Sequence, residues 1–258
     1  MAKRGRDGLV AMAIIKIPNM AMSIVIIAVM GLPGGASWPF VLTSGVVNCL
    51  YFYFLLNAYR VGDLSLAYPV ARGIAPLLVV VLSAFIASEV PSPGALAGIA
   101  VTCLGIIAIA QSRSSAHHGA TIAWAAGVGL CISIYTLLDG MGARLSGNAF
   151  GYVAVLNVFT GIAVCGTALA RRGAAFVEAL KADWKNGVLG GAMMLGAYSI
   201  AVYAMTLAPM AQVAALRESS VVFAAILAAI FLKEPFGGKR IAAACAVTAG
   251  IVILATSR

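Results

Sequence analysis

The sequence has few charged residues: Asp, Glu, Lys and Arg make up 10% of its 258 residues, against about a quarter in soluble domains. An ordinary soluble domain is excluded, because 62% of the chain is hydrophobic and the mean hydropathy is +1.04. The apolar residues form runs of about 20, the length that crosses about 30 Å of hydrocarbon as a helix. Since lipid cannot hydrogen-bond the backbone, these runs predict an all-α membrane protein.

Motifs for catalysis, nucleotide binding and metal binding are also lacking. The sequence has no Walker loop, HExxH, GxSxG or aspartate cluster, so we expect neither an enzyme nor an ATP-driven pump, and no cofactor. The adjacent His117 and His118 have no acidic or thiol neighbour and make a poor metal site. All five cysteines lie in apolar runs without metal-ligand spacing, and we interpret them as packing residues.

The net charge of +9 is carried by the short breaks between apolar runs. No stretch combines basic residues with exposed aromatics, so we expect a lipid bilayer and not a nucleic acid as the surrounding partner. With a cytoplasmic amino terminus, 12 of the 17 Lys and Arg lie inside, two lie outside and three lie within helices. The positive-inside rule therefore predicts a multi-pass protein of the cell (inner) membrane with its amino terminus in the cytoplasm.

Nine apolar runs follow one another along the chain, separated by turn-forming Gly, Pro, Ser and Asn residues. They cover residues 9–30, 39–59, 65–87, 94–112, 119–139, 149–170, 187–207, 211–232 and 238–256. We expect nine transmembrane helices, with consecutive helices antiparallel. The longest break, 171–186, places basic residues around an apolar stripe and predicts a short amphipathic helix at the membrane interface.

An internal repeat appears when the chain is shifted by 145 residues, because residues 58–113 then align with 203–258 without a gap. The aligned charged pairs are Arg72 with Arg217 and Glu89 with Glu234. We interpret the two glutamates as structural groups at helix ends. Five helix steps separate the copies, an odd number, so they cross the membrane in opposite directions, as in the inverted repeats of secondary transporters.

The repeat divides the chain into unequal halves. Residues 1–113 form a first half-repeat of four helices, and residues 114–258 form a second half-repeat of five. The run at 119–139 has no partner, because its equivalent would precede Met1. We therefore expect two inverted repeats derived from an ancestral 5+5 helix bundle whose first helix is missing here.

The residues that end each half resemble a known family. They are 58–73 (AYRVGDLSLAYPVARG), Glu89 and Gly105 in the first half, and 216–220 (LRESS), 231–235 (FLKEP) and 250–254 (GIVIL) in the second. The chain is similar to EamA-type members of the drug/metabolite transporter superfamily, whose ten helices form two inverted halves. The YPVARG segment looks most like a subgroup linked to phosphonate use. The resemblance implies a transporter of small metabolites. Family members usually have a cytoplasmic carboxyl terminus. The distribution of basic residues predicts the reverse for this chain, because nine spans separate a cytoplasmic amino terminus from a carboxyl terminus on the outside.

Ionisable side chains inside a span cost about 2.5–3.5 kcal/mol or more, so each needs a compensating role. Arg72 and Arg217 lie on the order of 10 Å inside their runs, and we expect both to face a central cavity that favours an anionic or zwitterionic metabolite. The alternative is that each reaches the interface or pairs locally. Glu218 is a candidate proton-coupling group or a permanent partner of an arginine. Lys16 is a third buried cation with no obvious partner.

Tyrosines and an amide complete the predicted substrate site. Tyr68 lies one helical turn from Arg72, and Tyr53 is the repeat mate of Tyr198. The predicted substrate-binding residues are Arg72, Arg217, Glu218, Tyr68, Tyr53, Tyr198 and Asn48. Tyrosines near the ends of runs also serve as interface anchors, which is the alternative role here.

These observations predict a secondary transporter, a permease or exporter, that works by alternating access with its site between the two halves. The expected partners are a small-molecule substrate, protons and the lipid bilayer, and a homodimer is one arrangement that the sequence allows. One alternative is a small-multidrug-type exporter of amphipathic cations, against which we count the lack of a lone acidic residue inside a span. A second alternative is a non-transport membrane scaffold or an intramembrane enzyme.

Overall fold

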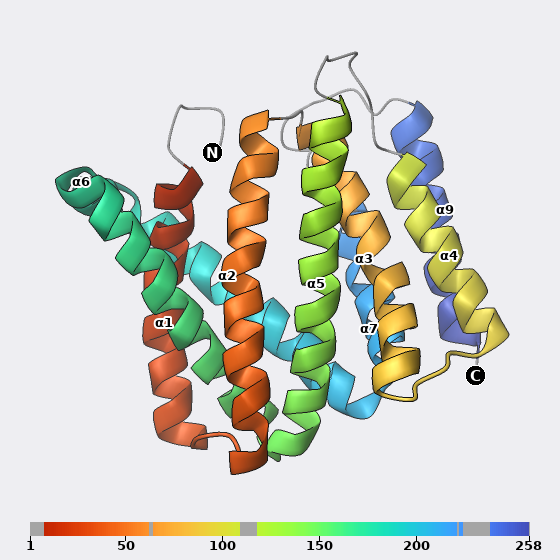
Figure 1. Ribbon diagram of the computed structural model, residues 1–258, viewed down its shortest axis with the longest axis horizontal. Helices are drawn as coiled ribbons and strands as arrows, with labels where there is room; N and C mark the ends of the chain where they lie inside the picture. The colour runs from red at the N-terminus through yellow and green to blue at the C-terminus, as the bar shows by residue number, and fades with distance from the viewer. Residues whose placement is uncertain (1–7, 62–63, 109–117, 221, 224–237, 258) are drawn as a thin grey trace. The chain divides into compact units, whose positions relative to one another are not determined.

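A computed structural model describes residues 8–61, 64–108, 118–220, 222–223 and 238–257 of the chain. Within these ranges the chain is helical and has no strand. Figure 1 shows α1 (Gly8–Met30), α2 (Trp38–Val61), α3 (Leu64–Ile86), α4 (Pro93–Ala108), α5 (His118–Ser146), α6 (Ala149–Leu207), α7 (Met210–Arg217) and α9 (Gly238–Thr256). A single 3-10 turn, η1 (Gly35–Ser37), precedes α2.

Five of the described helical segments are long and apolar enough to cross a membrane. They are Gly8–Met30, Gly35–Ala58, Leu66–Ile86, Gly119–Ser146 and Ala149–Leu207, and shorter apolar helices cover Pro93–Ala108 and Ile241–Thr256. The prediction of an all-α membrane protein is thereby confirmed. Of the predicted span at 211–232, residues 221 and 224–232 lie outside the described residues.

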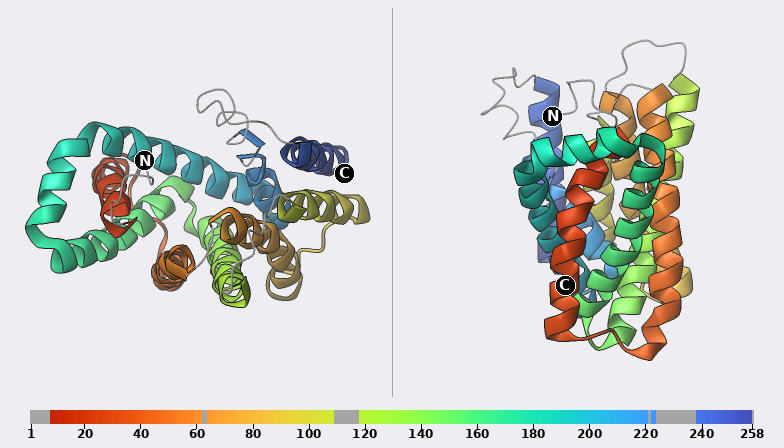
Figure 2. Two further views of the ribbon diagram at one scale, coloured as in Figure 1. Left: turned by 90° about the horizontal axis from the view of Figure 1, so that it is seen from above. Right: turned by 90° about the vertical axis from the view of Figure 1, so that its left-hand side faces the viewer.

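Helix α6 has 59 residues, which would extend about 90 Å if straight, about three times the hydrocarbon thickness. Non-helical dihedrals at Gly173 (φ 46°, ψ −122°) and Asp183 (φ −128°, ψ 19°) divide it into three limbs. The positive φ at Gly173 suits glycine, which has no Cβ to clash. In the left view of Figure 2 the ribbon of α6 runs outward, turns, and then runs back in its last limb. The first and last limbs match the predicted runs at 149–170 and 187–207, and the segment between them is helical, as predicted.

The chain forms two compact units. Unit 1 comprises Met1–Leu50 and Leu138–Leu207, and unit 2 comprises Tyr51–Leu137 and Ala208–Arg258. Helices α2 and α5 each contribute residues to both units. Each unit therefore contains residues from before and after the repeat boundary at 113/114. The half-repeats describe similarity along the sequence, whereas the compact units describe which residues pack together.

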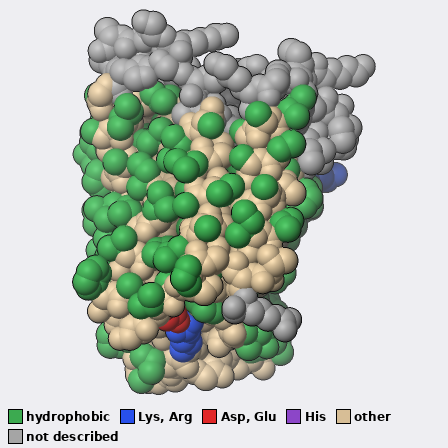
Figure 3. All heavy atoms as spheres, turned by 90° about the vertical axis from the view of Figure 1, so that its right-hand side faces the viewer, with side chains coloured by type: hydrophobic (Ala, Val, Ile, Leu, Met, Phe, Trp, Pro, Cys, Tyr) green, Lys and Arg blue, Asp and Glu red, His purple; other side chains and the backbone are tan. Residues whose placement is uncertain are grey.

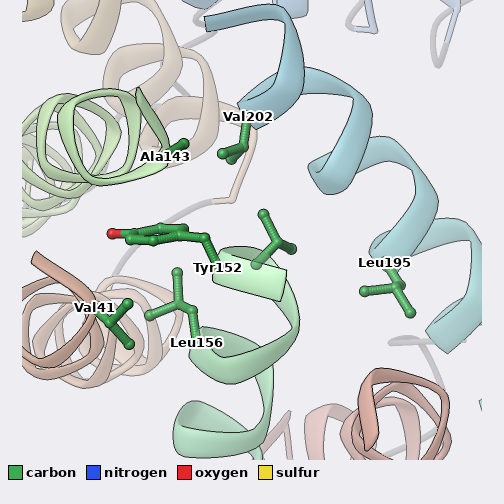
Figure 4. Close-up of a cluster of buried hydrophobic side chains, with 7 residues drawn as sticks. Val41, Ala143, Tyr152, Leu156, Leu195 and Val202 are labelled. Atoms are coloured by element: carbon green, nitrogen blue, oxygen red, sulfur yellow. The ribbon is translucent and has the colours of Figure 1, made fainter. Parts of the chain in front are cut away.

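In unit 1, α1 packs against α6 at positions where glycine brings the two backbones close. A Cβ on Gly187 would lie 2.6 Å from the carbonyl oxygen of Ile14, and one on Gly191 would lie 2.8 Å from that of Ile15. An apolar cluster fills the rest of the unit; it consists of Val41, Ala143, Tyr152, Val153, Leu156, Leu195 and Val202. Figure 4 shows the Tyr152 ring extending from α6 toward the space between α2 and α5.

In unit 2, α3 packs against α4 and α7, and α4 packs against α9. The contact between α4 and α9 is also a glycine contact, because a Cβ on Gly98 would lie 2.8 Å from the carbonyl oxygen of Gly250. On the outward side these helices present apolar residues such as Leu104 and Val252. Figure 3 shows that the face of the molecule on the α4 and α9 side is covered largely by hydrophobic side chains, as a surface in contact with lipid requires.

Candidate functional site

Arg72 on α3 is held by two side chains that follow α7 in unit 2. Its Nε lies 3.0 Å from Oε2 of Glu218, and its Nη2 donates a hydrogen bond of 2.9 Å to Oγ of Ser220. The two charged side chains are 19% and 5% exposed. A buried charge of either sign is costly alone, so the pair explains how both residues can lie within apolar helices.

The sequence left open whether Glu218 pairs with the adjacent Arg217 or with the other arginine. The structure places Glu218 in an ion pair with Arg72 on α3. Arg217 is the last residue of α7 and is partly buried. The two arginines that the repeat relates therefore differ in position, since Arg72 lies within α3 and Arg217 is the last residue of α7.

A cavity of about 210 Å³ lies beside Arg72 within unit 2. Its lining comprises Tyr51, Leu55 and Ala58 of α2, Ala67, Tyr68, Ala71 and Arg72 of α3, and Ala125, Val128, Ile132 and Tyr135 of α5. Drug-sized ligands occupy about 300–1,000 Å³, so this cavity has room for a smaller metabolite. Its polar lining consists of three phenols and one guanidinium, and this set can donate several hydrogen bonds to an anionic group.

The aromatic rings of the cavity are arranged around this guanidinium. The Cζ atom of Arg72 lies 5.8 Å from the ring centroid of Tyr68, within the range of a cation–π contact. The rings of Tyr51 and Tyr135 meet edge to face, with centroids 5.9 Å apart. Tyr68 was predicted from its spacing to Arg72, whereas Tyr135 was missed because only the packing of α5 against α2 brings it here.

Arg217 and Tyr53 do not line this cavity. Tyr53 is 58% exposed and packs edge-on against Trp124, with centroids 6.1 Å apart. Tyr51, two residues earlier on α2, takes the lining position instead. Two helical residues differ in direction by about 200°, so one of the two tyrosines faces the cavity and the other faces away.

The other two predicted site residues, Tyr198 and Asn48, belong to a polar cluster in unit 1. The cluster is centred on Asp139 of α5, which is 0% exposed. The hydroxyl of Tyr198 donates to Oδ2 of this carboxylate, and Oγ of Ser44 donates to Oδ1 at 2.5 Å. Tyr152 also donates to Oδ1, at 3.0 Å. Asn48 joins the cluster by donating to the carbonyl oxygen of Ser44 at 3.1 Å.

Sequence reasoning missed Asp139 because it ended the apolar run at that residue. Helix α5 continues to Ser146, so the aspartate lies within the helix. The absence of a strong turn signal before Gly147 and Asn148 could have revealed this continuation. The statement that no span contains a lone acidic residue was therefore wrong, and it does not argue against cationic substrates.

Lys16, the buried cation without an obvious partner in the sequence, also lies in unit 1. Its side chain is held by α6, because Nζ donates to Oδ1 of Asn157 at 3.1 Å and to Oγ1 of Thr160 at 2.9 Å. Both acceptors are uncharged. They supply part of the solvation that the ammonium group loses when α1 packs against α6.

Glu89 connects the end of α3 to the start of α7 in unit 2. Its Oε2 accepts a hydrogen bond of 2.8 Å from the backbone N–H of Met210, the first residue of α7. A carboxylate at a helix N-terminus satisfies a backbone donor that has no partner within the helix. This contact fits the structural role predicted for Glu89, and its repeat mate Glu234 lies outside the described residues. Across the described part of the chain, no group of three or more His, Cys, Asp or Glu could hold a metal ion.

Comparison with known proteins adds two findings. Residues 119–256, more than half of the chain, match the EamA-like transporter family. A solved structure described only as the crystal structure of a protein has a TM-score of 0.72 and 17% sequence identity, covering 97% of this chain and 88% of that chain. At this identity the likeness concerns the fold alone. No curated protein sequence matches the chain.

Proposed function

This chain belongs to the EamA-like transporter family, and we propose that it is a secondary transporter that carries a small anionic or zwitterionic metabolite across the cell (inner) membrane by alternating access. Membership of the family makes the chain a membrane transporter of the drug or metabolite type. The single observation that carries the substrate class is Arg72 in the wall of a cavity of about 210 Å³ with three tyrosines.

The Arg72–Glu218 pair explains how this cavity remains stable without substrate. The glutamate neutralises the guanidinium, so the empty site does not hold an isolated charge in a low-dielectric environment. A carboxylate or phosphonate group that enters takes hydrogen bonds from the guanidinium, which has five N–H donors. A zwitterion additionally brings an ammonium group, which can make a cation–π contact with a tyrosine of the lining.

The inverted repeat is part of this proposal, because alternating access in such transporters uses two similar halves of opposite direction. Helices α4 and α9 are repeat mates, and their contacts support the relationship. A Cβ on Gly250 would lie 2.7 Å from the backbone nitrogen of Thr102, and one on Gly105 would lie 3.2 Å from that of Val247. The shift of 145 residues converts each of these two contacts into the other, as expected for elements related by a two-fold axis.

The proposed topology has nine transmembrane helices, four in residues 1–113 and five in residues 114–258. The basic residues favour an amino terminus in the cytoplasm, with 12 of them inside and two outside. Export of amphipathic cations is a weaker candidate, because the cavity in unit 2 is lined by a cation and by no acidic residue. No feature of the described residues favours an enzyme or a scaffold.

The test is transport by the full-length chain reconstituted in lipid vesicles. The probes are 2-aminoethylphosphonate, succinate and tetraphenylphosphonium, which represent a zwitterion, an anion and an amphipathic cation. We expect uptake of the first or second probe, and its loss in Arg72→Ala. The matched control is Arg171→Ala, which removes an exposed arginine from the middle of α6. Uptake of tetraphenylphosphonium alone, or uptake that survives Arg72→Ala, would refute the proposed substrate class.

A further inference from the structure

The cavity beside Arg72 is elongated along its three helices, and contacts between these helices show which lining residues lie at each end. A Cβ on Gly129 of α5 would lie 3.0 Å from the carbonyl oxygen of Ala71 on α3. Oγ of Ser133 donates to the carbonyl oxygen of Ala75 at 3.1 Å. Both contacts join residues 58 positions apart (129 − 71 and 133 − 75), so α3 and α5 run in the same direction and such residues lie at the same level.

Helix α2 runs in the opposite direction to α5. The ring of Tyr51 meets that of Tyr135 with centroids 5.9 Å apart, whereas Phe54 meets Trp124 with centroids 5.6 Å apart. Moving forward along α2 therefore means moving backward along α5. It follows that α2 ends on the side where α3 and α5 begin, as the ribbon shows (Figure 1).

Three alanines line the end of the cavity on this side. Ala67 and Ala125 are 58 positions apart (125 − 67) and so lie at one level, and Ala58 lies close to the last residue of α2. Each of the three is at most 3% exposed. These side chains present only methyl groups, which neither donate nor accept hydrogen bonds. A charged group placed at this end would lose its hydration without a replacement from these side chains.

The polar side chains lie further along the cavity. Arg72 is five residues after Ala67 on α3, about 7.5 Å along the helix axis. Tyr135 is ten residues after Ala125 on α5, and its ring contacts that of Tyr51. The cavity therefore has an inner end with a guanidinium and phenols and an outer end of alanines.

Arg72 has donors beyond those that its present partners use. Its Nε faces Glu218, and its Nη2 donates one hydrogen bond to Ser220. A guanidinium has five N–H donors. Within the described residues, no oxygen accepts a hydrogen bond from Nη1. An anionic headgroup can therefore bind Arg72 while the ion pair with Glu218 remains in place.

We propose that the substrate is a short acid whose anionic headgroup binds Arg72 and whose far end, toward the three alanines, is uncharged. The inference rests on the proposed transporter function and narrows its substrate class. A second charge close to the headgroup, as in 2-aminoethylphosphonate, remains among the tyrosines, where a cation–π contact is available. A second charge at the far end of a longer body has no such partner, so acids with a charge at each end of that body are rejected.

The size of the cavity limits the length of the body. A cavity of about 150 Å³ in another protein binds benzene, so about 210 Å³ has room for roughly eight non-hydrogen atoms. The axial distance of about 7.5 Å from Ala67 to Arg72 agrees with a body of this size. Pentanoate fits within these limits, and octanoate exceeds them.

The direct test is calorimetric titration of the full-length protein in lipid nanodiscs with pentanoate and pentanedioate. The two acids have the same carbon chain, but pentanedioate carries a second carboxylate at its far end. We expect pentanoate to bind at least tenfold more tightly, and to lose its binding in Arg72→Ala but not in Arg171→Ala, which changes an exposed arginine of α6. Equal affinity for the two acids, or no binding of pentanoate, would overturn the proposal.

Two leucines of α2 form a matched pair for testing where the body lies. Leu55 lines the cavity and is 8% exposed, whereas Leu50 is 48% exposed and does not line it. Leu55→Ala enlarges the cavity and should raise the affinity for octanoate at least tenfold, and Leu50→Ala should leave it unchanged. The same affinity for octanoate in both variants would contradict the proposed position.

A substitution at the alanine end keeps the test decisive if Leu55→Ala does not fold. Ala125→Val adds two methyl groups where the far end of the body lies. It should weaken the binding of pentanoate and leave the binding of acetate, which has no body beyond its methyl group, unchanged. Equal losses for both acids would show that the alanine end is not where the body is bound.

Transport separates this inference from the proposed function. Uptake of 2-aminoethylphosphonate into vesicles should be inhibited by pentanoate and not by pentanedioate. If the vesicles take up this probe and both acids inhibit equally, the transporter function stands and the inference fails. If the vesicles move no probe at all, the proposed function fails, while the calorimetric comparison still decides which acid the cavity binds.

Discussion

Arg72 on α3 and Glu218, which directly follows α7, form a buried ion pair with 3.0 Å between Nε and Oε2. The two residues are far apart in the sequence, and the pair ties α3 to the segment after α7 within unit 2. It also sets the charge of the cavity wall, since Arg72 is the cation among the lining residues.

Removing one partner of this pair should destabilise the protein more than removing both. A single charge left in a buried site costs about 3–5 kcal/mol, whereas an uncharged replacement of the whole pair is often tolerated. We expect Glu218→Gln to lower the thermal unfolding temperature in detergent, and Glu218→Gln combined with Arg72→Met to recover part of the loss. If the effects of Glu218→Gln and Arg72→Met on the unfolding temperature simply add in the double variant, the two residues are not energetically coupled.

The tyrosines of α2 should differ in their effect on transport. Tyr51→Phe removes a hydroxyl from the cavity lining and should raise the KM for an anionic or zwitterionic probe by about tenfold, the equivalent of one hydrogen bond to a charged group. Tyr53→Phe changes an exposed residue that packs on Trp124 and should leave KM unchanged. Equal effects of the two substitutions would place the substrate elsewhere.

The glycine contact between α1 and α6 should tolerate no side chain. A Cβ on Gly191 would lie 2.8 Å from the carbonyl oxygen of Ile15, so Gly191→Ala must push the helices apart and should lower stability by about 1–3 kcal/mol. Gly196→Ala, on the same limb of α6, meets no atom within 4 Å and should be neutral or slightly stabilising because alanine favours helix. Thermal unfolding of the purified variants measures the difference.

The proposed topology can be tested with membrane-impermeant thiol labelling in intact cells. A cysteine introduced at Glu178, on the middle limb of α6, should be protected because that segment is expected in the cytoplasm. A cysteine introduced at Gly35, where a side chain meets no atom within 4 Å, should be labelled from outside. The opposite labelling pattern would show that the protein has the reverse of the orientation derived from the basic residues.

Several elements could be predicted because their causes are local. The runs at 9–30 and 238–256 correspond closely to α1 and α9, since a continuous apolar segment in lipid has only the helix available to it. The end of α5 was placed seven residues too early because a single aspartate was treated as the boundary of a run. Hydropathy describes the solvent that a side chain prefers by itself. It does not indicate when a carboxylate is buried because three hydroxyl donors replace water around it.

The candidate site was predicted only in part for a similar reason. Arg72 and Tyr68 were identified because a charge in an apolar run is rare and their spacing places them on one helix face. Tyr135 and Asp139 gave no comparable signal, since each acquires its role from side chains on other helices. The role of Tyr198 also changed, because its hydroxyl donates to Asp139 within unit 1.

The sequence by itself determined that this protein is helical, lies in a membrane and carries rare charges at a few positions, because composition and hydropathy act over one helix at a time. Only the tertiary structure decided which charges meet. The pairing of Glu218 with Arg72, and the enclosure of Asp139 by hydroxyls from α2 and both outer limbs of α6, depend on how the helices rotate and pack against one another. Helix periodicity restricts the face on which a side chain lies, but the partner on that face is set by contacts between distant segments.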